Sequence, residues 1–136
     1  MLMTKALDRR TVLSTLWIFV MFNYLYADLS LSIFIPGMYE KMMAGMSAWV
    51  LVVATALMEL QIAMILSSRL LPHKINRLAN IIVGVIATLF VAVTLSRNSP
   101  GFYLLLATIE IVTTLFIIWY AWTWRAPVED AALEAS

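Results

Sequence analysis

Four long apolar stretches dominate the sequence, separated by short segments that are polar or contain proline. They cover approximately residues 13–35, 49–71, 75–95 and 102–124. A bilayer core of about 30 Å requires roughly 20 helical residues, so each stretch predicts one membrane-spanning helix. The sequence therefore predicts an all-α protein with four spans, in a single integral membrane domain that covers residues 1–136.

Short connections predict how these spans are arranged. Pro36 and Gly37 end the first span, because proline interrupts a helix and glycine permits a sharp turn. Residues 38–47 then predict a short helix that lies at the outer membrane interface. Residues 72–74 and 97–101 predict tight turns. Since short turns join consecutive helices as antiparallel neighbours, we expect an up-down-up-down four-helix bundle.

The first stretch has an alternative interpretation as a cleaved signal peptide. The apolar part of a signal peptide is about 7–15 residues long and is followed by a cleavage site with small residues. Residues 13–35 exceed that length and contain no such site. We therefore expect this segment to remain as a span.

Basic residues predict the orientation in the membrane. One side of the predicted bundle carries seven of them, namely Lys5, Arg9, Arg10, Arg69, Lys74, Arg77 and Arg125. The other side carries only Lys41 and Arg97. Because cytoplasmic loops are enriched in lysine and arginine, both termini are predicted to be cytoplasmic.

Composition excludes several classes of protein. The chain is 63% hydrophobic and 12% charged, with a mean hydropathy of +0.93, whereas soluble domains are about 45–50% apolar and about 25% charged. It contains no cysteine, which excludes disulfides and thiolate metal sites. Its single histidine, His73, lies in a predicted turn, which excludes an intramembrane histidine–metal or haem site. No nucleophile–histidine pair or phosphate loop is present, so we expect no catalytic residue and no metal ligand, and nothing indicates a nucleic-acid partner.

Three acidic residues lie inside the predicted spans. At about 1.5 Å per residue, Asp28, Glu59 and Glu110 lie about 10, 15 and 12 Å from the outer ends of their helices. We therefore expect three carboxylates in one layer of the bundle. A charge at such depth costs at least a few kcal/mol, and intramembrane ionisable groups usually mark functional sites.

Helical spacing adds neutral polar residues to these acids. The candidate ligand-binding residues are Asp28, Glu59, Glu110, Tyr24, Asn23, Asn80 and Thr113. No lysine or arginine lies in the same half of any span. Either the acids are neutral, or an external cation such as a proton, a metal ion or an organic amine completes the site. The alternative is that protonated acids serve only as hydrogen-bond donors between helices, at about 0.6 kcal/mol each.

Two sequence patterns relate to helix packing. The third span carries Asn76, Asn80, Gly84 and Thr88 at four-residue intervals, which predicts a close packing face. The motif Ala-x-x-Glu occurs in the second span at Glu59 and in the fourth at Glu110. This similarity indicates an internal repeat of helix pairs, or chance likeness between two apolar helices.

Several segments resemble a family of short bacterial integral membrane proteins that has no known activity. They are residues 16–28 (LWIFVMFNYLYAD), 58–64 (MELQIAM), 77–80 (RLAN) and 107–122 (ATIEIVTTLFIIWYAW). The resemblance implies a four-span protein of the bacterial inner membrane. In architecture the chain is also similar to DoxX-like proteins, some of which are tied to quinone or thiol redox complexes. A looser likeness is to the sterol-isomerase and sigma-2-receptor group, whose membrane carboxylates hold cationic amphiphiles.

These observations leave three hypotheses of function. In the first, the acidic pocket binds a cation or a hydrophobic amine, with transport as an extension. In the second, the chain is an accessory or structural subunit of a membrane complex, or forms a homo-oligomer. In the third, it is a DoxX-like membrane redox protein. The sequence identifies no cofactor. The partner that it predicts most directly is the lipid bilayer.

Overall fold

The computed structural model describes residues 8–95 and 100–125, which contain five helices. Four of them are long, namely α1 (Arg9–Phe34), α3 (Ala48–Leu70), α4 (His73–Thr94) and α5 (Gly101–Trp122). The fifth is the short helix α2 (Met38–Ala44). Each long helix has the length and apolar composition needed to cross a membrane. The predicted all-α fold with four candidate spans is therefore confirmed.

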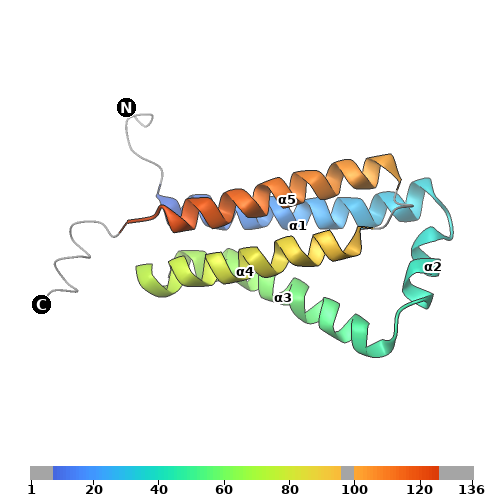
Figure 1. Ribbon diagram of the computed structural model, residues 1–136, viewed down its shortest axis with the longest axis horizontal. Coiled ribbons are helices and arrows are strands. Elements are labelled where there is room, and N and C mark those ends of the chain that lie inside the picture. Colours follow the sequence, from blue (N-terminus) through green and yellow to red (C-terminus); the bar gives the residue numbers. More distant parts are fainter. Residues whose placement is uncertain (1–7, 96–99, 126–136) are drawn as a thin grey trace, which may run out of the picture.

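The four long helices form a ring in which each contacts two others (Figure 1). α1 packs against α3 and α5, and α4 packs against α5 and α3. Consecutive long helices run in opposite directions, so the start of α1 and the end of α5 lie at the same end of the bundle, here called the termini end (Figure 1). α2 lies across the opposite end, here called the α2 end. This arrangement is the predicted up-down-up-down bundle.

Local capping explains where the first helices begin. The Asp8 carboxylate accepts hydrogen bonds from the Arg10 backbone N–H at 3.3 Å and from Thr11 Oγ1 at 3.4 Å. This N-cap makes α1 begin one turn before its predicted start. Gly37 precedes α2 with a φ of 82°, a left-handed conformation that glycine adopts freely. Ser47, which was predicted to belong to the short helix, instead caps α3.

The remaining ends of the long helices lie within two residues of their predicted positions. α3 ends at Leu70 because Leu71 precedes Pro72 and is extended, as residues before proline usually are. α4 then begins directly after this proline. Of the turn predicted before α5, residues 96–99 lie outside the described residues.

The seam between α4 and α5 is the most extensive helix contact. Gly84 lies so close to α5 that a Cβ atom at this position would come within 2.7 Å of Ile118 Cγ1. One turn further, the Thr88 and Thr114 hydroxyls are 2.8 Å apart. The predicted packing face at Gly84 and Thr88 is thus confirmed, and small residues achieve the close approach.

Large apolar side chains cover the outside of the bundle. Phe22, Trp49 and Val93 are 66%, 74% and 82% exposed, respectively. Such a surface suits lipid, which is as apolar as these side chains. α3 is the most exposed long helix: it diverges from α4 towards the α2 end, and none of residues 48–60 is buried (Figure 1).

Candidate functional site

Three buried polar side chains from three helices converge inside the bundle. Tyr24 of α1, Gln61 of α3 and Glu110 of α5 are 8%, 1% and 4% exposed. The Tyr24 hydroxyl lies close to Glu110 and Gln61. Nevertheless Tyr24 Oη, Gln61 Oε1 and Glu110 Oε1 are all buried without a hydrogen-bond partner. A buried polar atom without a partner costs roughly 1–3 kcal/mol, so three together are unusual for a packed interior.

Two further side chains surround this group. Asp28 is half-buried on α1, one turn beyond Tyr24, and interacts electrostatically with Glu110. Tyr103 of α5 interacts with both carboxylates. We call these five residues, Tyr24, Asp28, Gln61, Tyr103 and Glu110, the acidic centre. It contains two carboxyl groups, two phenols and one amide, and therefore more acceptors than donors.

Helix geometry sets the depth of the acidic centre. Glu110 lies nine residues into α5, about 13 Å from the α2 end of that helix. Gln61 is the first buried residue of α3, and its Nε2 donates to the Leu57 carbonyl at 3.3 Å. That bond orients the amide and leaves its carbonyl oxygen unpaired. The acidic centre therefore lies deep inside the candidate membrane-spanning part of the bundle.

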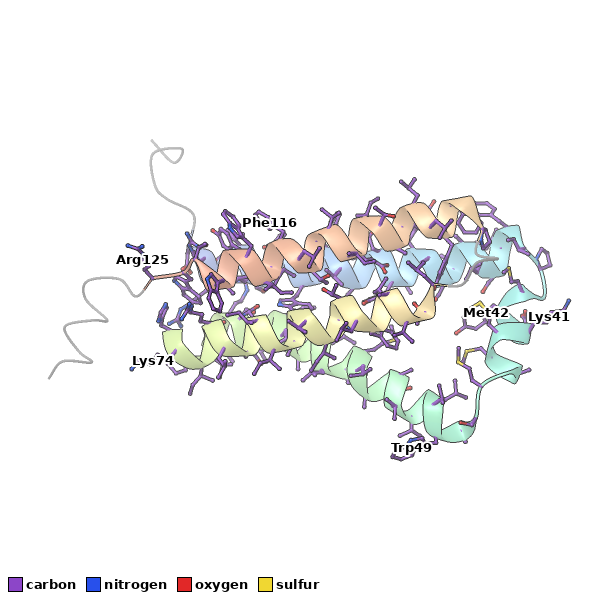
Figure 2. All side chains as sticks on the ribbon, viewed as in Figure 1. Lys41, Met42, Trp49, Lys74, Phe116 and Arg125 are labelled. Carbon is purple, nitrogen blue, oxygen red and sulfur yellow. The ribbon has the colours of Figure 1, made fainter. Side chains whose placement is uncertain are left out.

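An apolar groove runs along the seam between α1 and α5, one turn from Glu110 towards the termini end. Its volume is about 300 Å³. It is lined by Leu16, Phe19, Val112, Thr113 and Phe116. Phe116 projects from the outer side of α5 (Figure 2) and is 42% exposed, so the groove opens towards the lipid-facing surface. The buried Glu110 therefore lies one helical turn from an apolar groove on the lipid-facing surface.

The structure places Glu59 apart from the other two acids. Its side chain is exposed on the divergent part of α3, whereas Glu110 is buried and Asp28 is half-buried. Equal depth therefore does not bring the three carboxylates together: Asp28 and Glu110 interact, and Glu59 faces outwards. The two Ala-x-x-Glu motifs occupy different environments in the bundle.

Of the candidates Asn23 and Thr113, Thr113 is a lining residue of the groove and Asn23 is not. The Thr113 hydroxyl donates to the Ile109 carbonyl at 2.7 Å. Asn23 is half-buried and donates from Nδ2 to the carbonyl of Phe19, another lining residue, at 2.9 Å. Both side chains thus make local hydrogen bonds within their own helices.

Asn80 belongs to a separate polar cluster closer to the termini end. Its Oδ1 accepts from Trp17 Nε1 at 2.7 Å and from Ser68 Oγ at 3.2 Å. Its Nδ2 donates to Asn76 O at 2.8 Å and to Asn76 Oδ1 at 2.7 Å. Two donors and two acceptors are thus in use, and no hydrogen-bonding capacity remains for a ligand. We call Trp17, Ser68, Asn76 and Asn80 the asparagine network.

Two members of the acidic centre are missing from the residues selected on sequence. Gln61 lies two residues after Glu59 in an apolar helix, and Tyr103 lies seven residues before Glu110, on the same helix face. The seven-residue spacing was available as a signal for Tyr103, and an amide within an apolar helix was the signal for Gln61. Within residues 8–95 and 100–125, no three His, Cys, Asp or Glu side chains gather closely enough to hold a metal ion.

Four long apolar helices and an apolar exterior together define a small multi-pass helical membrane protein. The chain belongs to the family of unknown function DUF6326, which matches residues 2–131. No match was found among curated proteins or among solved structures. The bacterial origin and the likeness to DoxX-like proteins remain predictions.

Proposed function

We propose that the acidic centre binds a cation, and that this cation is the ammonium group of a hydrophobic amine. The observation that carries the proposal is the convergence of three unpaired buried oxygens, on Tyr24, Gln61 and Glu110, beside a second carboxyl group. An ammonium group supplies N–H donors to such acceptors and a charge opposite to that of the carboxylates.

The apolar groove favours an amine with a hydrocarbon tail over a small inorganic ion. Ligand sites are mostly apolar with a few convergent polar groups, and a groove of about 300 Å³ is at the lower end of their usual size. The amine would lie with its nitrogen at Glu110 and its tail beyond Thr113. Binding at this depth also suits transport of the amine across the membrane.

The distribution of basic residues supports an orientation with cytoplasmic termini. Among the described residues, the termini end carries Arg9, Arg10, Arg69, Lys74, Arg77 and Arg125. Lys41 lies at the α2 end, far from Lys74 and Arg125 (Figure 2). By the positive-inside rule, the acidic centre then lies in the outer half of the bacterial inner membrane.

Thermal stability of the detergent-purified protein tests the proposal. The probes are a series of long-chain alkylamines and, as controls, the uncharged alcohols of equal chain length. We expect the amines to raise the Tm of the wild type by several degrees, because a ligand at 100 times its Kd adds about 2.7 kcal/mol of stability. The alcohols should raise it far less.

Substitutions identify the responsible carboxyl groups. Glu110→Gln and Asp28→Asn should abolish the amine-dependent shift. Glu59→Gln is the matched control, since it neutralises the acid of the same motif on the exposed face of α3 and should retain the shift. Equal shifts in all three variants would contradict the proposal. Absence of any shift in the wild type would mean that the acids are protonated packing groups.

One observation favours a second candidate, a subunit role in a membrane complex or homo-oligomer. Glu59 is exposed on α3, where lipid would otherwise surround it, and a charged carboxylate within a span costs about 2.5–3.5 kcal/mol. Ala56 and Ala63 are exposed on the same face, and small residues permit close helix contact. A partner helix over this face would remove Glu59 from lipid.

Native mass spectrometry from lipid nanodiscs tests this candidate. We expect the wild type to be an assembly and Glu59→Leu to shift it towards the single chain. Glu110→Gln should leave the assembly unchanged, because Glu110 is buried inside one chain. A single chain in the wild type, or an unchanged assembly in Glu59→Leu, would count against the subunit role.

A further inference from the structure

A second cavity lies at the termini end of the bundle, between the start of α4 and the end of α5. Its volume is about 540 Å³. It is lined by His73, Arg77, Trp122, Thr123, Trp124 and Arg125. Two arginines and a histidine therefore share one hollow with two tryptophans. Neither the acidic centre nor its groove includes any of these residues.

Arg77 is held in place by the end of α5. Its Nε donates to the Ala121 carbonyl at 3.2 Å and its Nη2 donates to the Trp122 carbonyl at 2.9 Å. Its guanidinium carbon lies 5.4 Å from the centre of the Trp122 ring. These two bonds use two of the five N–H donors of the guanidinium. The side chain is thus fixed while most of its donors remain for another acceptor.

His73 is fixed in the same way. Its Nε2 lies 3.3 Å from the Trp124 carbonyl oxygen, and its ring packs edge-on against Trp124 with centroids 4.7 Å apart. Its Nδ1 is buried without a hydrogen-bond partner. Trp124 itself is only 7% exposed and forms the inner wall. The wall of the cavity is therefore ordered by contacts between α4 and residues 121–124.

The electrostatic setting of the cavity favours an anion. α4 begins here after Pro72, without a side-chain cap, so the positive end of its dipole faces this region. Arg125 is exposed and lies at the same end of the bundle as Lys74 (Figure 2). Tryptophan is characteristic of the membrane–water interface, which places the cavity at the depth of lipid headgroups.

From this arrangement we propose that the termini-end cavity binds the phosphate group of an anionic ligand. Arginine matches phosphate geometry through paired N–H groups, and basic hollows between membrane helices bind phospholipid headgroups. Either an anionic phospholipid or a soluble phosphate compound supplies this chemistry. The proposal is independent of amine binding at Glu110, because the two sites share no residue.

Retention of phosphatidylglycerol by the purified protein tests the proposal, measured by native mass spectrometry with the zwitterionic phosphatidylcholine as the reference of zero net charge. We expect the wild type to prefer phosphatidylglycerol at least tenfold. Arg125→Gln and Arg77→Gln should each reduce this preference by at least fivefold. Arg125→Gln is the decisive variant, since Arg77 also holds the end of α5. Arg10→Gln is the matched control, because it removes a charge from the same end outside the cavity.

Competition with inorganic phosphate separates the two sources of ligand. Displacement of phosphatidylglycerol by millimolar phosphate would identify a site that accepts soluble phosphate. Retention in the presence of phosphate would identify a lipid headgroup site. Equal loss in Arg125→Gln and Arg10→Gln would overturn the proposal, because it would show attraction by the overall surface charge. Equal retention of the two lipids by the wild type would overturn it as well.

Discussion

The asparagine network and the acidic centre are both buried polar groups inside the same bundle, but they use their hydrogen-bonding capacity differently. Asn80 is fully buried and makes four hydrogen bonds of 2.7–3.2 Å to Trp17, Ser68 and Asn76. Gln61 is equally buried and makes one long bond, of 3.3 Å, within its own helix. Its carbonyl oxygen remains unpaired, as do the Tyr24 hydroxyl and one carboxyl oxygen of Glu110.

The difference shows what a buried polar residue contributes in a membrane helix. A network in which every donor has an acceptor fixes the relative positions of the helices, because the bilayer core contains no water that could replace a broken hydrogen bond. An unsaturated group costs stability in the free protein and is repaid only when a ligand supplies the missing donors. A buried polar residue therefore does not by itself indicate a binding site. Whether its hydrogen-bonding groups are paired distinguishes a structural residue from a candidate binding residue.

The largest expected effect comes from breaking the asparagine network. Asn80→Leu preserves side-chain size but removes four hydrogen bonds and leaves Trp17 Nε1 unpaired. At about 0.6 kcal/mol for each bond in a membrane protein, the free energy of unfolding should fall by about 2–3 kcal/mol. The measurement is equilibrium unfolding in mixed micelles with increasing denaturing detergent.

Asn23→Leu is the control for this experiment. Asn23 makes a single local bond to Phe19 and is half-buried, so its replacement should change the free energy of unfolding by about 0.5 kcal/mol or less. If Asn80→Leu were as mild as Asn23→Leu, the network would contribute no more than an ordinary helix contact.

The sequence predicted the fold well because helix length and helix breakers are local properties. Apolar stretches of about 20 residues and the prolines between them located four helices, and all ends except the start of α1 lay within two residues. The start of α1 was placed one turn late because the cap at Asp8 precedes the apolar stretch. The packing face of α4 was also predictable, since Gly84 and Thr88 distinguish it from the rest of the helix.

The candidate site was predicted only in part, for a physical reason. Counting residues along a helix gives the depth of a side chain in the membrane. Which face of the helix points into the bundle can be predicted only where the faces differ in polarity. In lipid, an outward-facing residue and a core residue are both apolar, so α3 and α5 show little asymmetry. Glu59 and Glu110 were therefore placed together by depth, whereas the structure turns one outwards and the other inwards. Asn80 was grouped with the acids for a different reason: it also faces inwards, but it lies near the start of α4, closer to the termini end than they do.

The smallest expected effect sharpens the comparison. Gln61→Met is the counterpart of Asn80→Leu, because it replaces an equally buried amide by an apolar side chain of similar shape. It removes one long local bond and also one unpaired acceptor. The two contributions offset each other, so the free energy of unfolding should change by at most about 0.5 kcal/mol, with a slight gain as the favoured direction. The same detergent titration measures it. A loss comparable to that of Asn80→Leu would show that Gln61 is as well satisfied as Asn80, and would remove the distinction on which the proposed amine site depends.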